Sequence, residues 1–247
     1  MRSLGLSVVV EAGAGGSLQV GDLVSGRPRQ WARRCVVKLF VHSCTADRQD
    51  GRSKAIPQGC DAVDLLGPLG TTGLTEYFGL FDVAHLKAGE TLDVSGAAGA
   101  TGNVVCQLAK RAGARVVAIA GGPEKCAWLE RELGVDKAVD YKSASFRADF
   151  AAAAPKLDVY FDNVGGEILD LALTQLNRGV RVILCGTAPR SVMVEGASDV
   201  MQQAQLQDSK LTGITNYFQL VMARAIMKRF LVFDYESRYA YMAAQGS

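Results

Sequence analysis

The sequence predicts an α/β protein with a Rossmann-type, doubly wound parallel sheet. Short apolar runs alternate with amphipathic stretches between residues 91 and 233, and this alternation is typical of parallel βαβ units. A glycine-rich loop, Gly96–Gly102, also follows one apolar run and opens a helical pattern, as a phosphate-binding loop does. The alternation and the loop together favour a dinucleotide-binding domain.

Each predicted element has its own signal. The run at 91–95 follows a turn, and the apolar residues after the loop recur at helical spacing until Gly113. Pro123 suits the first turn of a helix that stops at Gly134. Further helices are expected at 167–176 and 216–227. Strands are expected at 91–95, 115–120, 138–141, 157–162, 180–185 and 230–233.

The first candidates for cofactor contact are the loop residues Gly99, Ala100, Thr101 and Gly102. Gly99 lets the backbone approach a pyrophosphate, and Gly102 allows the helix to pack closely on the strand. The start of the helix supplies free N–H groups to the anion. Ala97 stands at the first glycine position of the fingerprint. A plain tight turn is the alternative interpretation.

The end of the second strand indicates which dinucleotide is bound. Enzymes that use the unphosphorylated cofactor usually place Asp or Glu there, to hold the ribose hydroxyls. This strand ends in Gly121 and Gly122 instead, and Lys125 follows in the first turn of the next helix. The missing acid removes a repulsion and the lysine adds an attraction to a 2′-phosphate, so the sequence favours NADP(H). An ordinary solvated lysine is the alternative.

Two further segments fall at the carboxyl ends of strands, where ligands of such sheets bind. In the segment 162–166, Asn163 can offer an amide to the cofactor. Around Cys185 and Gly186, the backbone can lie against the nicotinamide ring. A simple turn into the following helix is the alternative role for the glycine pair at 165–166.

Five motifs occur in one order, at residues 64–67, 72–80, 94–102, 121–126 and 160–166. From about residue 64 to residue 235, this series resembles the zinc-independent medium-chain dehydrogenase/reductases of the alkenal, enone and prostaglandin reductase group (leukotriene B4 dehydrogenase-like). That group reduces the carbon–carbon double bond of α,β-unsaturated aldehydes and ketones with NADPH. The resemblance also assigns cofactor contacts to Tyr141, Phe230, Leu231 and Val232.

The resemblance divides the chain into two parts. Residues 1–66 are expected to be a partial, β-rich GroES-like catalytic domain, and residues 67–247 the NADP-binding domain. Compared with the family, the chain is expected to be shortened at both ends. Ser191 stands where the family has a tyrosine near the nicotinamide, so no catalytic residue is assigned and weak turnover is expected.

Three functions follow from this interpretation. The first is NADPH-dependent reduction of the C=C bond of an enone-type small molecule. The second is a carbonyl or quinone reductase in secondary metabolism, and the third is a catalytically impaired NADPH-binding protein. The resemblance leaves open a homodimer.

The composition argues against other classes of function. A net charge of +2 gives no general reason to expect nucleic acid, and the basic stretch 27–54 is interpreted as solvated surface rather than an RNA-binding arm. Six scattered cysteines and only two histidines make a zinc site hard to assemble, so no metal is expected. The cysteines suit a reducing compartment, and no segment could span a membrane. The start of the chain is interpreted as a strand at 6–11 rather than a signal peptide, and the protein is placed in the cytoplasm.

Overall fold

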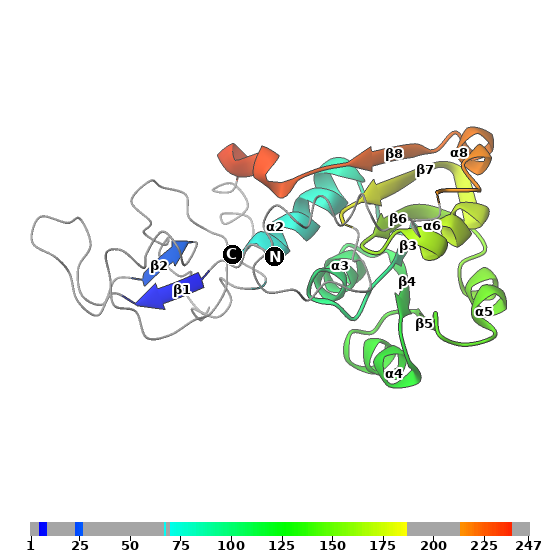
Figure 1. Ribbon diagram of the computed structural model, residues 1–247, viewed down its shortest axis with the longest axis horizontal. Coiled ribbons are helices and arrows are strands. Elements are labelled where there is room, and N and C mark those ends of the chain that lie inside the picture. The colour runs from blue at the N-terminus through cyan, green and yellow to red at the C-terminus, as the bar shows by residue number, and fades with distance from the viewer. Residues whose placement is uncertain (1–4, 9–22, 27–66, 68–69, 187–212, 239–247) are drawn as a thin grey trace, which may run out of the picture. The chain divides into compact units, whose positions relative to one another are not determined.

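The computed structural model describes residues 5–8, 23–26, 67, 70–186 and 213–238 (Figure 1). The chain divides into two compact units, one of residues 1–74 and 235–247 and the other of residues 75–234. The division after residue 74 lies later in the chain than the predicted boundary after residue 66. The basic stretch 27–54 and Ser191 lie outside the described residues.

The first unit contains a small antiparallel pair of strands. β1 (Gly5–Val8) pairs with β2 (Leu23–Gly26), with Gly5 opposite Gly26 and Val8 opposite Leu23. β1 overlaps the strand expected at residues 6–11.

The second unit is built on a six-stranded sheet in which every pairing is parallel. Its order is β5-β4-β3-β6-β7-β8, so the chain starts in the middle, moves to one edge, and then returns to build the other half. This is the 3-2-1-4-5-6 order of dinucleotide-binding folds, and the predicted fold class is confirmed. The strands are β3 (Thr91–Val94), β4 (Arg115–Ala120), β5 (Lys137–Asp140), β6 (Leu157–Asp162), β7 (Leu176–Leu184) and β8 (Ile226–Arg229).

Helices connect the strands, and most begin or end where the sequence signals stand. Pro123 lies at the start of its helix, and Gly134 beyond its end has a φ of 63°. The helices are α2 (Thr71–Tyr77), a π-helix (Phe78–Val83), α3 (Ala100–Arg111), α4 (Pro123–Glu132), α5 (Phe146–Ala153), α6 (Gly166–Ala172), α8 (Phe218–Ala223) and two 3-10 helices (Leu173–Gln175 and Val232–Arg238).

Both faces of the sheet are covered, as neighbouring residues of β6 show. Tyr160 belongs to a core cluster that includes residues of α5 and α6. The next residue, Phe161, points to the other face, because its ring lies 2.7 Å from where a Cβ of Gly79 in the π-helix would be. Apolar side chains on both faces explain why the strands read as continuous apolar runs.

The prediction of a sixth strand at residues 230–233 is wrong. The last strand is β8, and residues 232–238 form a 3-10 helix. The expected helix at 216–227 is also shorter, because Arg224 adopts a left-handed conformation (φ 51°) that ends α8. The last strand, β8, therefore begins earlier in the chain than the apolar pattern indicates.

A partly buried ion pair joins β7 to the turn before β3. The guanidinium of Arg181 donates to both carboxylate oxygens of Glu90, at 2.5 and 3.0 Å, and its Nε donates to the carbonyl oxygen of Ala84 at 2.8 Å. The two charged side chains are each 19% exposed, so water screens the pair only in part.

Replacing Arg181 with alanine should lower the free energy of unfolding by about 2–3 kcal/mol, because Glu90 would keep its partial burial without its bidentate partner. Urea unfolding followed by circular dichroism measures this effect. Arg178→Ala removes an exposed arginine from the same strand and serves as the control. Equal stability of the two variants would contradict the expectation.

Candidate functional site

The glycine-rich loop connects β3, the first strand of the sheet, to α3. Gly96 takes a φ of 62°, and the amide of Gly99 closes the turn by donating to the Gly96 carbonyl at 2.9 Å. The amide of Ala97 donates to the carbonyl of Ile119 in β4, which fixes the loop against the neighbouring strand. The loop is therefore held at the carboxyl edge of the sheet.

Two glycines of the loop have different structural roles. A Cβ on Gly102 would lie 2.4 Å from the Gly96 carbonyl oxygen and 2.6 Å from the Cα of Ala97, so only glycine fits there. Gly99 is exposed, has ordinary dihedrals (φ −81°, ψ 172°), and a Cβ would meet only the Gly96 oxygen at 3.1 Å. Gly102 therefore allows the close packing of α3, while Gly99 leaves room for a ligand at the surface of the loop.

The start of α3 is suited to an anion. Gly99 is its N-cap and provides no side-chain hydrogen bond to the first turn, which also contains no acidic residue. The first amides of a helix have no partner within the helix, and the helix dipole adds positive potential there. Ala100, Thr101 and Gly102 belong to this turn. A phosphate group fits such an uncapped start.

A hydrogen-bonded network joins the ends of β3 and β6, where the strand order changes direction. The Ser95 hydroxyl donates to Asp162 at 2.9 Å and accepts from the Asn163 amide at 2.9 Å. The Asn163 side-chain amide donates to the Ser95 carbonyl, also at 2.9 Å. This side chain, expected to serve the cofactor, therefore holds the two strand ends together in the structure.

Asp162 organises the surrounding loops. Burial raises its pKa, although the amide of Gly165 donates to its carboxylate at 3.0 Å and opposes the rise. Its backbone carbonyl accepts from the amides of Cys185 and Gly186, at 2.9 and 3.2 Å. The end of β7 is thereby positioned beside the end of β6. Asp162 and Ser95 were not among the predicted site residues, although a polar residue at the end of an apolar strand is a signal for them.

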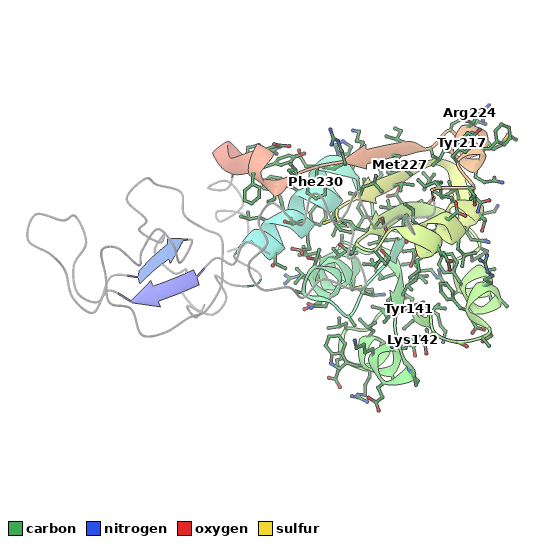
Figure 2. All side chains as sticks on the ribbon, viewed as in Figure 1. Tyr141, Lys142, Tyr217, Arg224, Met227 and Phe230 are labelled. Atoms are coloured by element: carbon green, nitrogen blue, oxygen red, sulfur yellow. The ribbon has the colours of Figure 1, made fainter. Side chains whose placement is uncertain are left out.

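The end of β4 forms a second part of the site. The carboxylate of Asp140 accepts from the amide of Gly122 at 2.7 Å and from that of Lys142 at 2.9 Å, and these bonds lower its pKa. The ring of Tyr141 lies against Gly121, 2.7 Å from where a Cβ would be. Lys125 is exposed in the first turn of α4. Tyr141 and Lys142 lie together in Figure 2.

The three predicted contacts after β8 have different surroundings. The ring of Phe230 lies 2.9 Å from where a Cβ of Gly79 would be. Leu231 is 64% exposed, whereas Val232 is buried. Figure 2 shows Phe230 far from Tyr141, so these two predicted contacts could reach only different parts of an extended ligand.

Residues 100–226 match the family model described as "Zinc-binding dehydrogenase". The match extends from the first residue of α3 to the first residue of β8, over half of the chain. The chain belongs to this family. Within the described ranges, no group of three His, Cys, Asp or Glu side chains could hold a metal ion, so these residues offer zinc no ligand set. None of the helices in the described part is long and apolar enough to cross a bilayer.

Several reductases are similar to this chain. A Bacillus subtilis (strain 168) protein, YfmJ, provisionally named an NADP-dependent oxidoreductase, is 39% identical over 247 residues, which are 99% of this chain and 66% of YfmJ. Prostaglandin reductase 1 from Bos taurus is 49% identical over 123 residues, or 49% of this chain and 37% of that protein. The 2-alkenal reductase (NADP(+)-dependent) of Nicotiana tabacum is 37% identical over 178 residues, or 70% and 47% of the two chains. These names confirm the resemblance to alkenal and prostaglandin reductases.

A solved structure is also similar. CurA from Vibrio vulnificus in complex with NADPH superimposes with a TM-score of 0.65 at 30% identity, and the comparison covers 99% of this chain and 76% of CurA. By contrast, the chain spans only 37% to 66% of the lengths of the three relatives.

Proposed function

We propose that this chain binds NADP(H) at the carboxyl edge of its six-stranded sheet, as part of an oxidoreductase that reduces the C=C bond of α,β-unsaturated aldehydes or ketones. The observation that carries the proposal is the position of the glycine loop. The loop follows β3, and the strand order changes direction between β3 and β6. Dinucleotides bind at this point in such sheets.

The described residues suit the parts of the cofactor. The uncapped start of α3 offers amides to the pyrophosphate, and exposed Gly99 leaves room for it. At the end of β4, the Gly121–Gly122 turn presents no acid, and the carboxylate of neighbouring Asp140 is engaged by two amides. Lys125 is available for a 2′-phosphate. At the other end of the ligand, the backbone at Cys185 and Gly186 would lie beside the nicotinamide.

NADPH supplies a hydride when bound, and the β-carbon of the activated alkene receives it. The protein must then stabilise the enolate with hydrogen-bond donors and deliver one proton to the α-carbon, which gives the saturated carbonyl compound and NADP⁺. The Ser95–Asp162–Asn163 network contributes rigidity, because it fixes the strand ends that position the ring. The support for an enone-type substrate is the likeness to reductases named for alkenals and prostaglandins.

Oxidation of NADPH measured against a panel of enones, quinones and aldehydes tests the activity. A saturated ketone as product supports C=C reduction, whereas an allylic alcohol or a hydroquinone supports carbonyl or quinone reduction. Binding of NADPH without turnover of any compound would identify a catalytically impaired protein.

Cofactor preference is a separate prediction. At equal concentration, NADPH should raise the melting temperature more than NADH, because a charge-assisted contact from Lys125 to the 2′-phosphate contributes about 1.5–3 kcal/mol. Lys125→Glu should remove most of the difference. Lys156→Glu, which changes an exposed lysine just before β6, should leave it intact. Equal stabilisation of the unaltered protein by both cofactors would refute this assignment.

We also propose a homodimer formed through the β8 edge of the sheet, where the described residues place no further strand. β8 is an edge strand, and exposed strand edges promote pairing with another chain. Large apolar side chains are exposed on β8, on α8 and at the residue just before α8; they are Tyr217, Phe218, Val221, Met222 and Ile226. Figure 2 shows Tyr217 and Met227 along this edge. Light scattering should give twice the mass of a single chain for the unaltered protein. For Ile226→Lys it should give the mass of a single chain.

Residues 1–66 are proposed to be part of a GroES-like catalytic domain, and residues 67–247 the NADP-binding domain. The cytoplasm is the proposed location of the protein, because the three cysteines within the described ranges, Cys106, Cys126 and Cys185, are free thiols.

A further inference from the structure

One carboxylate oxygen joins the two turns that are assigned to the 2′-phosphate end of the cofactor. The Oδ1 atom of Asp140, the last residue of β5, accepts a hydrogen bond from the amide of Gly122 at 2.7 Å and from that of Lys142 at 2.9 Å. Gly122 lies between β4 and α4, and Lys142 follows β5. Because β4 and β5 are parallel neighbours, the carboxylate bridges them at the carboxyl edge of the sheet.

The turn between β4 and α4 contains two glycines in succession. The second, Gly122, is the N-cap of α4 and has a φ of 104°, a conformation that side chains rarely adopt. No side chain caps the start of α4, and a Cβ on Gly122 would meet nothing within 4 Å. Glycine loses more conformational freedom than other residues when it is ordered. The bond from the Gly122 amide to Asp140 therefore helps to fix where α4 begins, and Lys125 lies in its first turn.

The turn after β5 is held at two points. The amide of Tyr141 donates to the carbonyl of Ala120 at 3.0 Å, and its ring lies against Gly121. The bond from the Lys142 amide to Asp140 then closes the turn immediately beyond Tyr141. Tyr141 and Lys142 lie together at this place in Figure 2. Asp140 therefore connects the turn that carries Tyr141 with the start of α4.

The position of Asp140 differs from that of the acid in NAD-dependent sites. That acid ends the second strand, where it holds the ribose hydroxyls. Here the second strand is β4, and the turn after it begins with Gly121. Asp140 ends the third strand, β5, and one of its oxygens already accepts two backbone amides. Its carboxylate is thus oriented by the protein backbone.

We propose that Asp140 is a positioning residue for the 2′-phosphate of NADPH, because it holds the turns that carry Lys125 and Tyr141 in one arrangement. The inference rests on the proposed NADP(H) site. A site that is already ordered loses less conformational freedom when its ligand binds, so fixing these turns strengthens the contact with the phosphate. NADH lacks this phosphate, and its affinity should depend much less on Asp140.

The dissociation constants of NADPH and NADH, measured by calorimetric titration of the 247-residue chain, test the proposal. Asp140→Ala should weaken NADPH binding by about tenfold, equal to about 1.4 kcal/mol, and NADH binding by much less. The preference for NADPH, expressed as the ratio of the two constants, should therefore fall. A general loss of folded protein would weaken both cofactors equally and leave the ratio unchanged. An unchanged ratio in a folded Asp140→Ala protein would overturn the proposal.

Two conservative variants separate the position of the oxygen from its charge. Asp140→Asn keeps an oxygen that can accept both amides but carries no charge, so it should keep at least the wild-type preference for NADPH. Asp140→Glu keeps the charge but its longer side chain displaces the oxygen, so the preference should fall. This pair decides the question even if Asp140→Ala does not fold. Wild-type preference in Asp140→Glu, or loss of the preference in Asp140→Asn, would contradict a positioning role.

Asp136 provides a matched control at the opposite end of the same strand. It lies just before β5, and its carboxylate accepts from the amide of Val116 in β4 at 2.7 Å and from the ammonium of Lys110 at 2.8 Å. Asp136→Ala removes a comparable support of β4 at the other edge of the sheet. It should lower the melting temperature without changing the ratio for the two cofactors. If both alanine variants lowered the ratio equally, loosening of β5 would explain the effect and the proposal would fail.

The results for the unaltered protein distinguish this proposal from the proposed function. If the unaltered protein binds neither dinucleotide, the proposed function itself fails. If it prefers NADPH and Asp140→Ala keeps the same preference, only the role of Asp140 fails. If Asp140→Ala instead prefers NADPH more strongly than the unaltered protein does, the carboxylate repels the phosphate, and the positioning role is refuted.

Discussion

Replacing Gly99 with valine is expected to weaken NADPH binding by roughly a hundredfold or more, equal to about 2.8 kcal/mol, while the protein still folds. The branched side chain would project from the exposed N-cap of α3 into the space assigned to the pyrophosphate. Folding should survive because Gly99 has ordinary dihedrals and a Cβ meets only one oxygen, at 3.1 Å. Calorimetric titration measures the affinity, and the melting temperature without cofactor reports the fold.

Gly102→Ala is the matched control, three residues further along the same loop. Its Cβ would lie 2.4 and 2.6 Å from backbone atoms that cannot rotate away, so this smaller change should destabilise the protein. Gly99→Val should therefore weaken ligand binding without loss of the fold, whereas Gly102→Ala should lower the stability of the protein. A folded Gly99→Val variant with unchanged NADPH affinity would mean that the loop is only a turn between β3 and α3.

The sheet could be predicted from the sequence because its signals are local. Strands β4 and β6 coincide with their apolar runs, and Pro123 and Gly134 mark the helix between β4 and β5. The alternation of strands and helices then leaves few possible topologies. The last strand was misplaced because the apolar run at 230–233 exceeds β8 in hydrophobicity, whereas the position of β8 is set by pairing with β7 and by the left-handed Arg224.

The site was less accessible to sequence reasoning, because its polar groups meet only in the folded chain. Asn163 could be placed at the correct edge, but its bonds to Ser95 depend on the pairing of β3 with β6, which are separated by more than sixty residues. Glu76, which is buried at the end of α2, carries no sequence signal of burial, since a glutamate at the end of a helix is usually solvated. Asp93 is different, because a charged residue inside an apolar strand can be recognised in the sequence. Such a residue indicates a buried group that lowers the stability of the fold.

Replacing Asp93 with valine is expected to raise the free energy of unfolding by about 2–4 kcal/mol near pH 8. In register, Asp93 is paired with Val117 of β4 and Tyr160 of β6, and both belong to the core cluster on one face of the sheet. Its carboxyl is fully buried there, without a hydrogen bond from any described residue. Valine is similar in size, has no group to desolvate and favours strands. Urea unfolding at fixed pH measures the gain.

The size of this gain should depend on pH in a defined direction. Burial first, and then the charge of Asp162, raise the pKa of Asp93 well above its ordinary 3.8, so the folded state holds a proton that the unfolded chain releases above about pH 4. The stability of the parent protein therefore falls as pH rises above 4, by up to about 1.4 kcal/mol per pH unit until the folded-state pKa is reached. The advantage of Asp93→Val should be larger at pH 8 than at pH 5.

Two further variants separate the charge of Asp93 from its lack of a partner. Asp93→Asn should remove the pH dependence but gain less stability than valine, because its amide stays unpaired. Asp162→Val is the control of opposite sign: that carboxylate accepts from Ser95 and Gly165, so its loss should destabilise the protein. An Asp93→Val protein no more stable than its parent at pH 8 would show that the buried carboxyl carries no cost.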